Sequence, residues 1–183
     1  MNSSSVAFAR TAPMIEGYDY RMVDEASPRD RDEAGRPKNA RPRDSLGRPL
    51  PRGAENAMFE EQLPEDPERL LDIGIEHFNA RRFFQAHETW ETAWHPSPDD
   101  ERDFWQGLTQ VAVGFTHYQR GNPKGAVTLL QRGARKIAAY GEVYKGVPVG
   151  ALAASARKAA AAIERAGTTT PIEFPTLHRT SVR

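Results

Sequence analysis

The sequence RFFQAHETWETAWHPSPDDERDFWQGLTQVAVGFTHYQR, residues 82–120, decides the fold of this chain. Apolar residues recur at every third or fourth position on both sides of the segment Ser-Pro-Asp-Asp, and this spacing is the period of an α-helix. The stretch therefore predicts two helices joined by a turn, over about 82–95 and 98–120. It also contains all three tryptophans and three of the five histidines, so we look for a functional site here as well.

Capping signals predict two further helices outside this stretch, and an Ala-rich segment predicts a third. Asp-Pro at 66–67 and Asn-Pro at 122–123 each combine a side chain that accepts from free amides with a proline suited to the first helical turn. We expect these helices to run to about residues 80 and 140, and a fifth to cover about 149–166. The predicted fold is all-α: an antiparallel bundle of about five helices in helical hairpins, over residues 64–167.

The two ends of the chain lack helical periodicity. Residues 1–63 contain repeated Pro and Gly, and residues 29–52 carry eight Lys/Arg against four Asp/Glu. We expect a disordered or extended arm, either a solvated linker or a docking arm that lies along RNA, an acidic protein groove or its own domain. Residues 168–183 are expected to form an extended tail, with Ile172 and Phe174 held against the bundle.

Composition restricts the function classes. The 25 basic and 25 acidic residues balance, so the molecule as a whole shows no polyanion-binding signature. The absence of cysteine excludes a disulfide framework, a thiolate metal site and a Cys nucleophile. We find no signal-peptide pattern and no membrane-spanning run, so we expect a cytoplasmic protein without a membrane partner. No Gly-rich phosphate loop or Ser elbow motif is present.

Helical geometry gathers polar residues on one side of each central helix. In the helix over 82–95, His87 lies within the apolar stripe and Glu91 lies at its edge. In the following helix, Gln106, Gln110 and Arg120 fall within about 60° of His117.

Two glycines, Gly107 and Gly114, stand beside the polar stripe of the second central helix. Each costs about 1 kcal/mol of helix stability relative to Ala, so we expect another backbone to approach closely there. If the helix over 82–95 is what approaches, His87 and Glu91 meet Gln110 and His117 in one partly buried polar cluster.

Two interpretations of this cluster remain open. In the first, it is a structural network of paired polar groups that fixes helix register. In the second, it binds a divalent metal ion or a small polar ligand, because His87-Glu88-Thr89-Trp90-Glu91 has the form HExxE, close to the HExxH of metalloproteases. In this interpretation the metal ligands are His87, Glu91 and His117, and the acid–base residues are Glu88 and His87. The residues that contact the ligand are Gln106, Gln110, Trp90 and Arg120. Trp90 is also well suited to the core.

A function of another class is a non-enzymatic adaptor. Its basic arm, residues 29–52, would dock on RNA or on a protein partner.

Several motifs carry a resemblance to a known family. The blocks HExxExxW from His87, QGLxQ from Gln106 and RGNxxGA from Arg120 occur in the order typical of the bacterial family catalogued as domain of unknown function 309. The chain resembles this family over about residues 67–140. The resemblance implies an all-helical bundle with no established activity, and it favours His87, Glu88, Glu91, Gln110 and His117 as the residues of interest.

Overall fold

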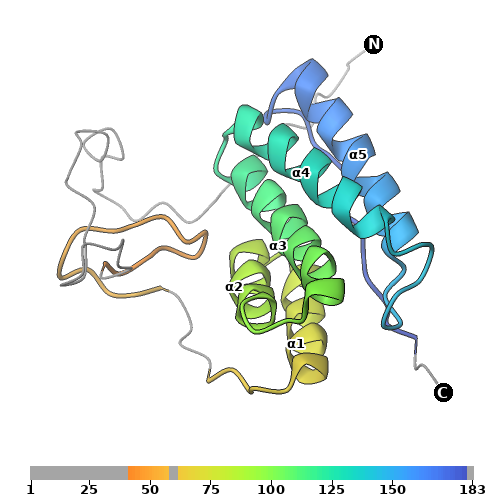
Figure 1. Ribbon diagram of the computed structural model, residues 1–183. Helices are drawn as coiled ribbons and strands as arrows, with labels where there is room; N and C mark the ends of the chain where they lie inside the picture. Colours follow the sequence, from red (N-terminus) through yellow and green to blue (C-terminus); the bar gives the residue numbers. More distant parts are fainter. Residues whose placement is uncertain (1–40, 58–61, 181–183) are drawn as a thin grey trace, which may run out of the picture. The chain divides into compact units, whose positions relative to one another are not determined.

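The computed structural model describes residues 41–57 and 62–180, and within them the chain is all-α (Figure 1). Apart from two isolated β-bridges, these residues contain no β-structure. The all-α prediction with about five helices is confirmed, and the parts of the expected arm at residues 1–40 and 58–61 lie outside the described residues. The helices are α1 (Pro67–Asn79), α2 (Phe83–Trp94), α3 (Asp99–Gln119), α4 (Pro123–Ala138) and α5 (Val149–Ala166).

Side-chain caps begin two of these helices where the sequence predicts them. The Asp66 carboxylate accepts from the amide of Glu68 at 3.0 Å, and the Asn122 side chain accepts from the amide of Gly125 at 2.9 Å. Ser97, the first residue of the Ser-Pro-Asp-Asp segment between the two central helices, donates its hydroxyl to the carbonyl of Trp94 at 2.7 Å. It closes the end of α2, and α3 begins after Pro98.

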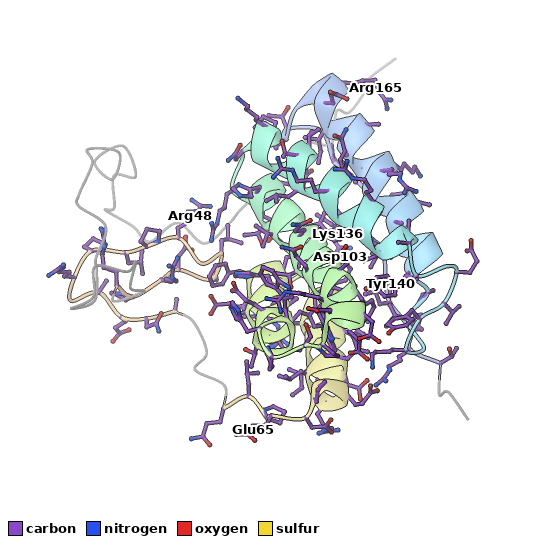
Figure 2. All side chains as sticks on the ribbon, viewed as in Figure 1. Arg48, Glu65, Asp103, Lys136, Tyr140 and Arg165 are labelled. Carbon is purple, nitrogen blue, oxygen red and sulfur yellow. The ribbon has the colours of Figure 1, made fainter. Side chains whose placement is uncertain are left out.

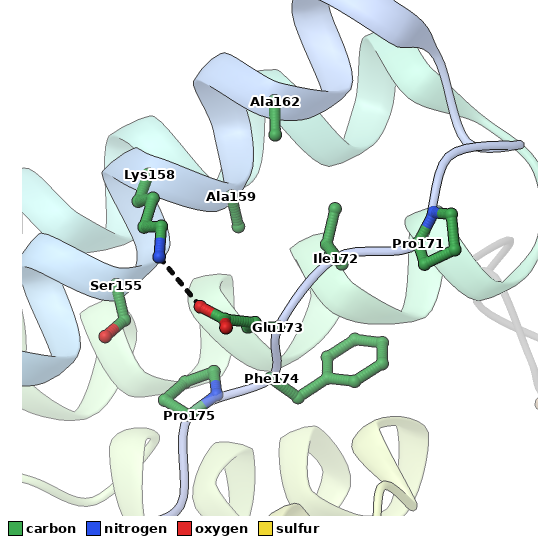
Figure 3. Close-up of a pocket in the computed structure, with 9 residues that line it drawn as sticks. All are labelled: Ser155, Lys158, Ala159, Ala162, Pro171, Ile172, Glu173, Phe174 and Pro175. Carbon is green, nitrogen blue, oxygen red and sulfur yellow. Dashed lines mark hydrogen bonds and ion pairs between the residues drawn. The ribbon is translucent and has the colours of Figure 1, made fainter.

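An aromatic cluster forms the centre of the core. The ring centroids of Phe78 and Phe83 are 5.0 Å apart, and Phe115 lies 5.0 Å from Phe83. The C-terminal tail closes this cluster, because the Phe174 ring lies 5.1 Å from Phe83 and 5.4 Å from Phe115. The tail passes along α5, where Glu173 pairs with Lys158 at 2.7 Å beside a shallow groove (Figure 3). Phe174 thus packs on the bundle as expected.

Glycines bring α3 and α4 into close backbone contact. A Cβ on Gly107 would lie 2.6 Å from a methyl carbon of Ile137, and a Cβ on Gly133 would lie 2.7 Å from the carbonyl oxygen of Gly107. Gly114 would place its Cβ 2.9 Å from the backbone nitrogen of Leu130. The close approach predicted from Gly107 and Gly114 is therefore real, but the approaching helix is α4 and not α2.

Substituting Gly133 tests this contact. Gly133→Ala removes a helix-breaking residue, which by itself favours the helix by about 1 kcal/mol. The new methyl group meets backbone atoms of α3, which cannot move aside as a flexible side chain can, so we expect a net loss of about 1–3 kcal/mol in the free energy of unfolding. Urea denaturation measures this change. Gln131→Ala, on the exposed side of α4, is the control and should leave the stability nearly unchanged, whereas a stabilised Gly133→Ala would contradict the contact.

Candidate functional site

His87 lies near the surface of α2 with its side chain 14% exposed. Its Nδ1 contacts the carbonyl oxygen of Phe84, and because a carbonyl only accepts, the neutral ring carries its proton on Nδ1. The lone pair of Nε2 then points toward two carboxylates, with Glu88 Oε1 at 4.0 Å and Glu91 Oε2 at 3.9 Å. Three acceptors converge here, and we call His87, Glu88 and Glu91 the acidic face.

Burial sets the charge state of this face. Desolvation is the largest influence on His87 and lowers its pKa; Arg120 and Arg43 act in the same direction, against the Phe84 carbonyl and Glu91. Desolvation also raises the pKa of Glu88, helped by Glu91 and opposed by Arg43. The imidazole is therefore neutral near pH 7, and the face favours a positively charged group or a hydrogen-bond donor.

Residues 41–50 form a tight loop, which we call the docked loop. The Asp44 carboxylate accepts from the amides of Leu46 at 3.0 Å and Arg48 at 2.7 Å, the pattern of an Asx turn. Gly47 has a φ of 74°, which glycine adopts without strain. The amide of Leu50 donates to the carbonyl of Pro42 at 2.7 Å and closes the base of the loop.

The docked loop packs on the helices beside the acidic face. Arg120 donates from Nε and Nη2 to the carbonyl of Leu46, at 2.9 and 2.6 Å. Its guanidinium carbon lies 5.2 Å from the centroid of the Phe84 ring, and that of Arg43 lies 5.4 Å from the same centroid. A Cβ on Gly47 would fall 2.3 Å from a Phe84 ring carbon, so only glycine fits.

Phe84 connects the docked loop to the acidic face. The Phe84 ring lies 4.6 Å from the His87 ring and also packs against Gly47 of the docked loop. Only 7% of Phe84 remains exposed. The part of the expected arm at residues 41–50 forms a closed loop that contacts its own domain, one of the options that its composition left open.

The other predicted site residues divide between the core and the α3–α4 turn. His117 accepts at Nδ1 from the Asn122 amide at 3.0 Å, where Gly125 packs against its ring. Trp90 is fully buried and its Nε1 faces the Leu71 carbonyl at 3.5 Å, so it belongs to the core.

The glutamines of α3 do not join the acidic face through any direct hydrogen bond in the described part of the chain. Gln106 is half-buried, and the Oε1 of Gln110 is buried without a hydrogen-bond partner among the described residues. The structure thus brings together His87, Glu88 and Glu91, with Arg120 nearby across Phe84. It does not add His117 to them, and in the described part of the chain no three His, Asp or Glu side chains are grouped closely enough to hold a metal ion.

The sequence did not identify Phe84, Arg43 or Gly47 as neighbours of the acidic face, although Arg43 and Gly47 lie within the predicted docking arm at residues 29–52. A signal for the turn was present, since Asp-Ser-Leu-Gly at 44–47 is a typical turn sequence, but nothing local indicates which surface receives it.

These features define a class: an all-helical domain with a His-Glu face that lies beside a loop of the same chain packed on Phe84. Among the described residues no helix has both the length and the apolar character needed to span a bilayer. Residues 71–129 match the family described as Domain of unknown function (DUF309), the family that the motifs of the chain resemble.

The chain is also similar to one bacterial protein over part of its length. The chain is 32% identical over 74 residues to the uncharacterized protein YpuF of Bacillus subtilis (strain 168), covering 40% of this chain and 42% of YpuF. The match therefore spans less than half of that relative. No solved structure matches the chain.

The environment of His87 predicts how its imidazole titrates in NMR experiments. Because the pKa of His87 is lowered, its titration midpoint should lie below the usual 6.5, with the Nδ1–H tautomer in the neutral form. A histidine with a lowered folded pKa gives stability that is present above pH 6.5 and is lost as the pH falls toward the folded midpoint. Nitrogen-15 spectra of the imidazole measure both midpoint and tautomer.

Two variants give the control for this titration. Glu91→Gln removes a charge that raises the His87 pKa and should move the midpoint lower, whereas Arg120→Gln removes one that lowers it and should move the midpoint higher. Shifts in the opposite directions, or an Nε2–H tautomer, would contradict the geometry.

Proposed function

We propose that this domain is a non-enzymatic binding module that recognises an arginine-bearing peptide turn, and that the docked loop occupies the binding surface in cis. The observation that carries the proposal is the paired hydrogen bond from Arg120 to the Leu46 carbonyl, made where Gly47 meets Phe84. Arg120 binds a backbone carbonyl of the turn, and Phe84 leaves room only for a glycine at the next residue. Both contacts are of a kind that can recognise a peptide turn.

Charge supports a basic occupant. Glu88 and Glu91 are 42% and 41% exposed, and the positive charge of Arg43 acts directly on the pKa of Glu88. An arginine in this position relieves the repulsion between the two carboxylates and the Nε2 lone pair of His87. The surface therefore selects a turn with glycine at its tip and arginine in its flank.

Occupation in cis supports an adaptor role. A tethered segment has an effective concentration on the order of millimolar, so a partner must present a better turn, or several contacts, to displace it. The hypothesis of an adaptor with a basic arm is thus refined, since the arm is the occupant and its displacement exposes the surface. The partner is then a protein, and we keep the cytoplasm as the expected compartment.

A variant that ejects its own loop tests this proposal. Gly47→Val places a branched side chain against Phe84 at a backbone φ that valine avoids, so the loop should detach while the bundle stays folded. A labelled peptide of residues 41–57 should then bind the full-length Gly47→Val protein in trans, as measured by fluorescence anisotropy. It should bind the parent protein far more weakly, because the cis loop competes.

Matched controls separate recognition from charge attraction. The same peptide carrying Gly47→Val keeps every charge and should not bind, and neither should the parent peptide bind a protein with Gly47→Val and Arg120→Gln together. Equal binding of both peptides would show that the contact is not specific and would refute the proposal.

A second candidate function is the binding of a divalent metal ion or a small ligand at the acidic face. If the domain is hydrolytic, Glu88 would act as the base. It is favoured by the Nε2 lone pair of His87 and the two carboxylates within 4.0 Å of it. These separations are wide for ligands that each lie about 2.1 Å from one ion, so the side chains would have to close in. Metal analysis of the purified protein should then find one ion per chain that is lost on His87→Ala, and a metal-free parent protein removes this candidate.

A further inference from the structure

The charges of this neutral chain are segregated by helix. Helices α1, α2 and α3 together hold nine Asp/Glu and two Lys/Arg, whereas α4 and α5 hold seven Lys/Arg and one Asp/Glu. The zero net charge therefore conceals a strongly basic pair of helices.

Two of the seven basic side chains have ion-pair partners. Lys136 pairs with Asp103 of α3, and the two lie side by side in Figure 2, while Lys158 pairs with Glu173. The other five are exposed and form no ion pair with a carboxylate of the described residues. We call them the basic face: Lys124, Arg132, Arg135, Arg157 and Arg165.

Three members of the basic face share one side of α4, and the other two lie on α5. On α4, Lys124, Arg132 and Arg135 fall within about 80° of one another and span about 16 Å along the axis. The opposite side of α4 is buried through Ala126, Leu130, Ala134 and Ile137.

Helix α5 continues this surface. The Arg157 guanidinium donates to the Ala134 carbonyl of α4 at 3.4 Å, so it lies over the seam between the two helices. Arg165, which is labelled in Figure 2, lies two turns further along α5, near the C-terminal end of the helix. The basic face thus holds five positive charges over about three turns of α4 and two turns of α5, with one carboxylate, Glu164, on the same helices.

We propose that the basic face binds the phosphate backbone of a nucleic-acid duplex. Four of its five residues are arginines, whose planar fork pairs with phosphate oxygens in a bidentate manner. Neither α4 nor α5 contains an aromatic residue, so the face lacks the stacking platform that single strands require. Contacts to phosphates alone suit a duplex and carry no sequence preference.

A membrane surface fits less well. Binding in a bilayer interface needs large apolar side chains beside the charges. Among the described residues the exposed large hydrophobic side chain is Val143, which belongs to neither helix. An acidic protein would need carboxylates that match the arginine positions, whereas a duplex offers phosphates at regular spacing on both strands.

Charge reversal on α4 tests the basic face in the full-length protein. The double variant Arg132→Glu/Arg135→Glu should bind 20-bp DNA and RNA duplexes at least about 10-fold more weakly than the parent, as measured by fluorescence anisotropy. The slope of log affinity against log salt should fall by about 2 units, one for each lost phosphate contact. Circular dichroism checks that both proteins keep their helices.

The matched control reverses two arginines of the acidic half. Arg69→Glu/Arg102→Glu changes the net charge equally, on exposed side chains that form no ion pair with described residues, and should leave affinity within about 2-fold. Equal losses in both double variants would show an effect of net charge only and would overturn the proposal. So would unchanged binding by the α4 variant, tighter binding of single strands, or binding of phosphatidylserine vesicles or polyglutamate in place of the duplexes.

Discussion

The close contact between α3 and α4 is the constraint on which the rest of the domain depends. Gly107 of α3 and Gly133 of α4 face each other with no room for a Cβ on either, and Gly114 meets the backbone of Leu130. Glycine lowers helix propensity, so this contact costs local stability and recovers it through close packing. It also fixes the rotation of α3 about its axis. His117, three residues beyond Gly114, is thereby directed to the start of α4, where Asn122 receives it.

The same constraint leaves one edge of α2 without a helical neighbour. The side of α3 that carries the glycines packs against α4, so α2 packs its aromatic side on α1 and on another side of α3. The acidic face of α2 therefore stays partly exposed. Phe84 lies at this edge and is too large and apolar to leave in water, since burying such a ring stabilises the fold by about 1.5–3 kcal/mol. The docked loop covers it, again through a glycine. Close packing at glycines therefore explains both the contact between α3 and α4 and the contact between the docked loop and Phe84.

Local signals in the sequence predicted the elements well, and non-local contacts set the limit. The Asp66 and Asn122 caps place two helix starts at the residues observed, because a cap acts within one turn of its own amide groups. Gly107 and Gly114 correctly indicated that a helix packs closely there, but they did not indicate which helix. Because we assigned that contact to α2, we wrongly predicted that His87 and Glu91 would meet His117. The Asp44 turn was likewise readable, whereas its contact with Arg120 joins residues 74 positions apart in the chain.

Charge segregation gives the two faces a common physical basis. With no net charge, the chain exerts no long-range pull on a polyanion, so the separation between its acidic and basic helices dominates the field near the surface. Such a field falls off within about 10 Å at 0.1 M salt, which makes each face sensitive to what lies directly against it. An arginine-bearing loop is attracted to the half of the domain that holds Glu88 and Glu91, and phosphates are attracted to the half that holds Arg132 and Arg135. The occupants that we propose for the two faces carry opposite charges, so neither would compete for the surface of the other.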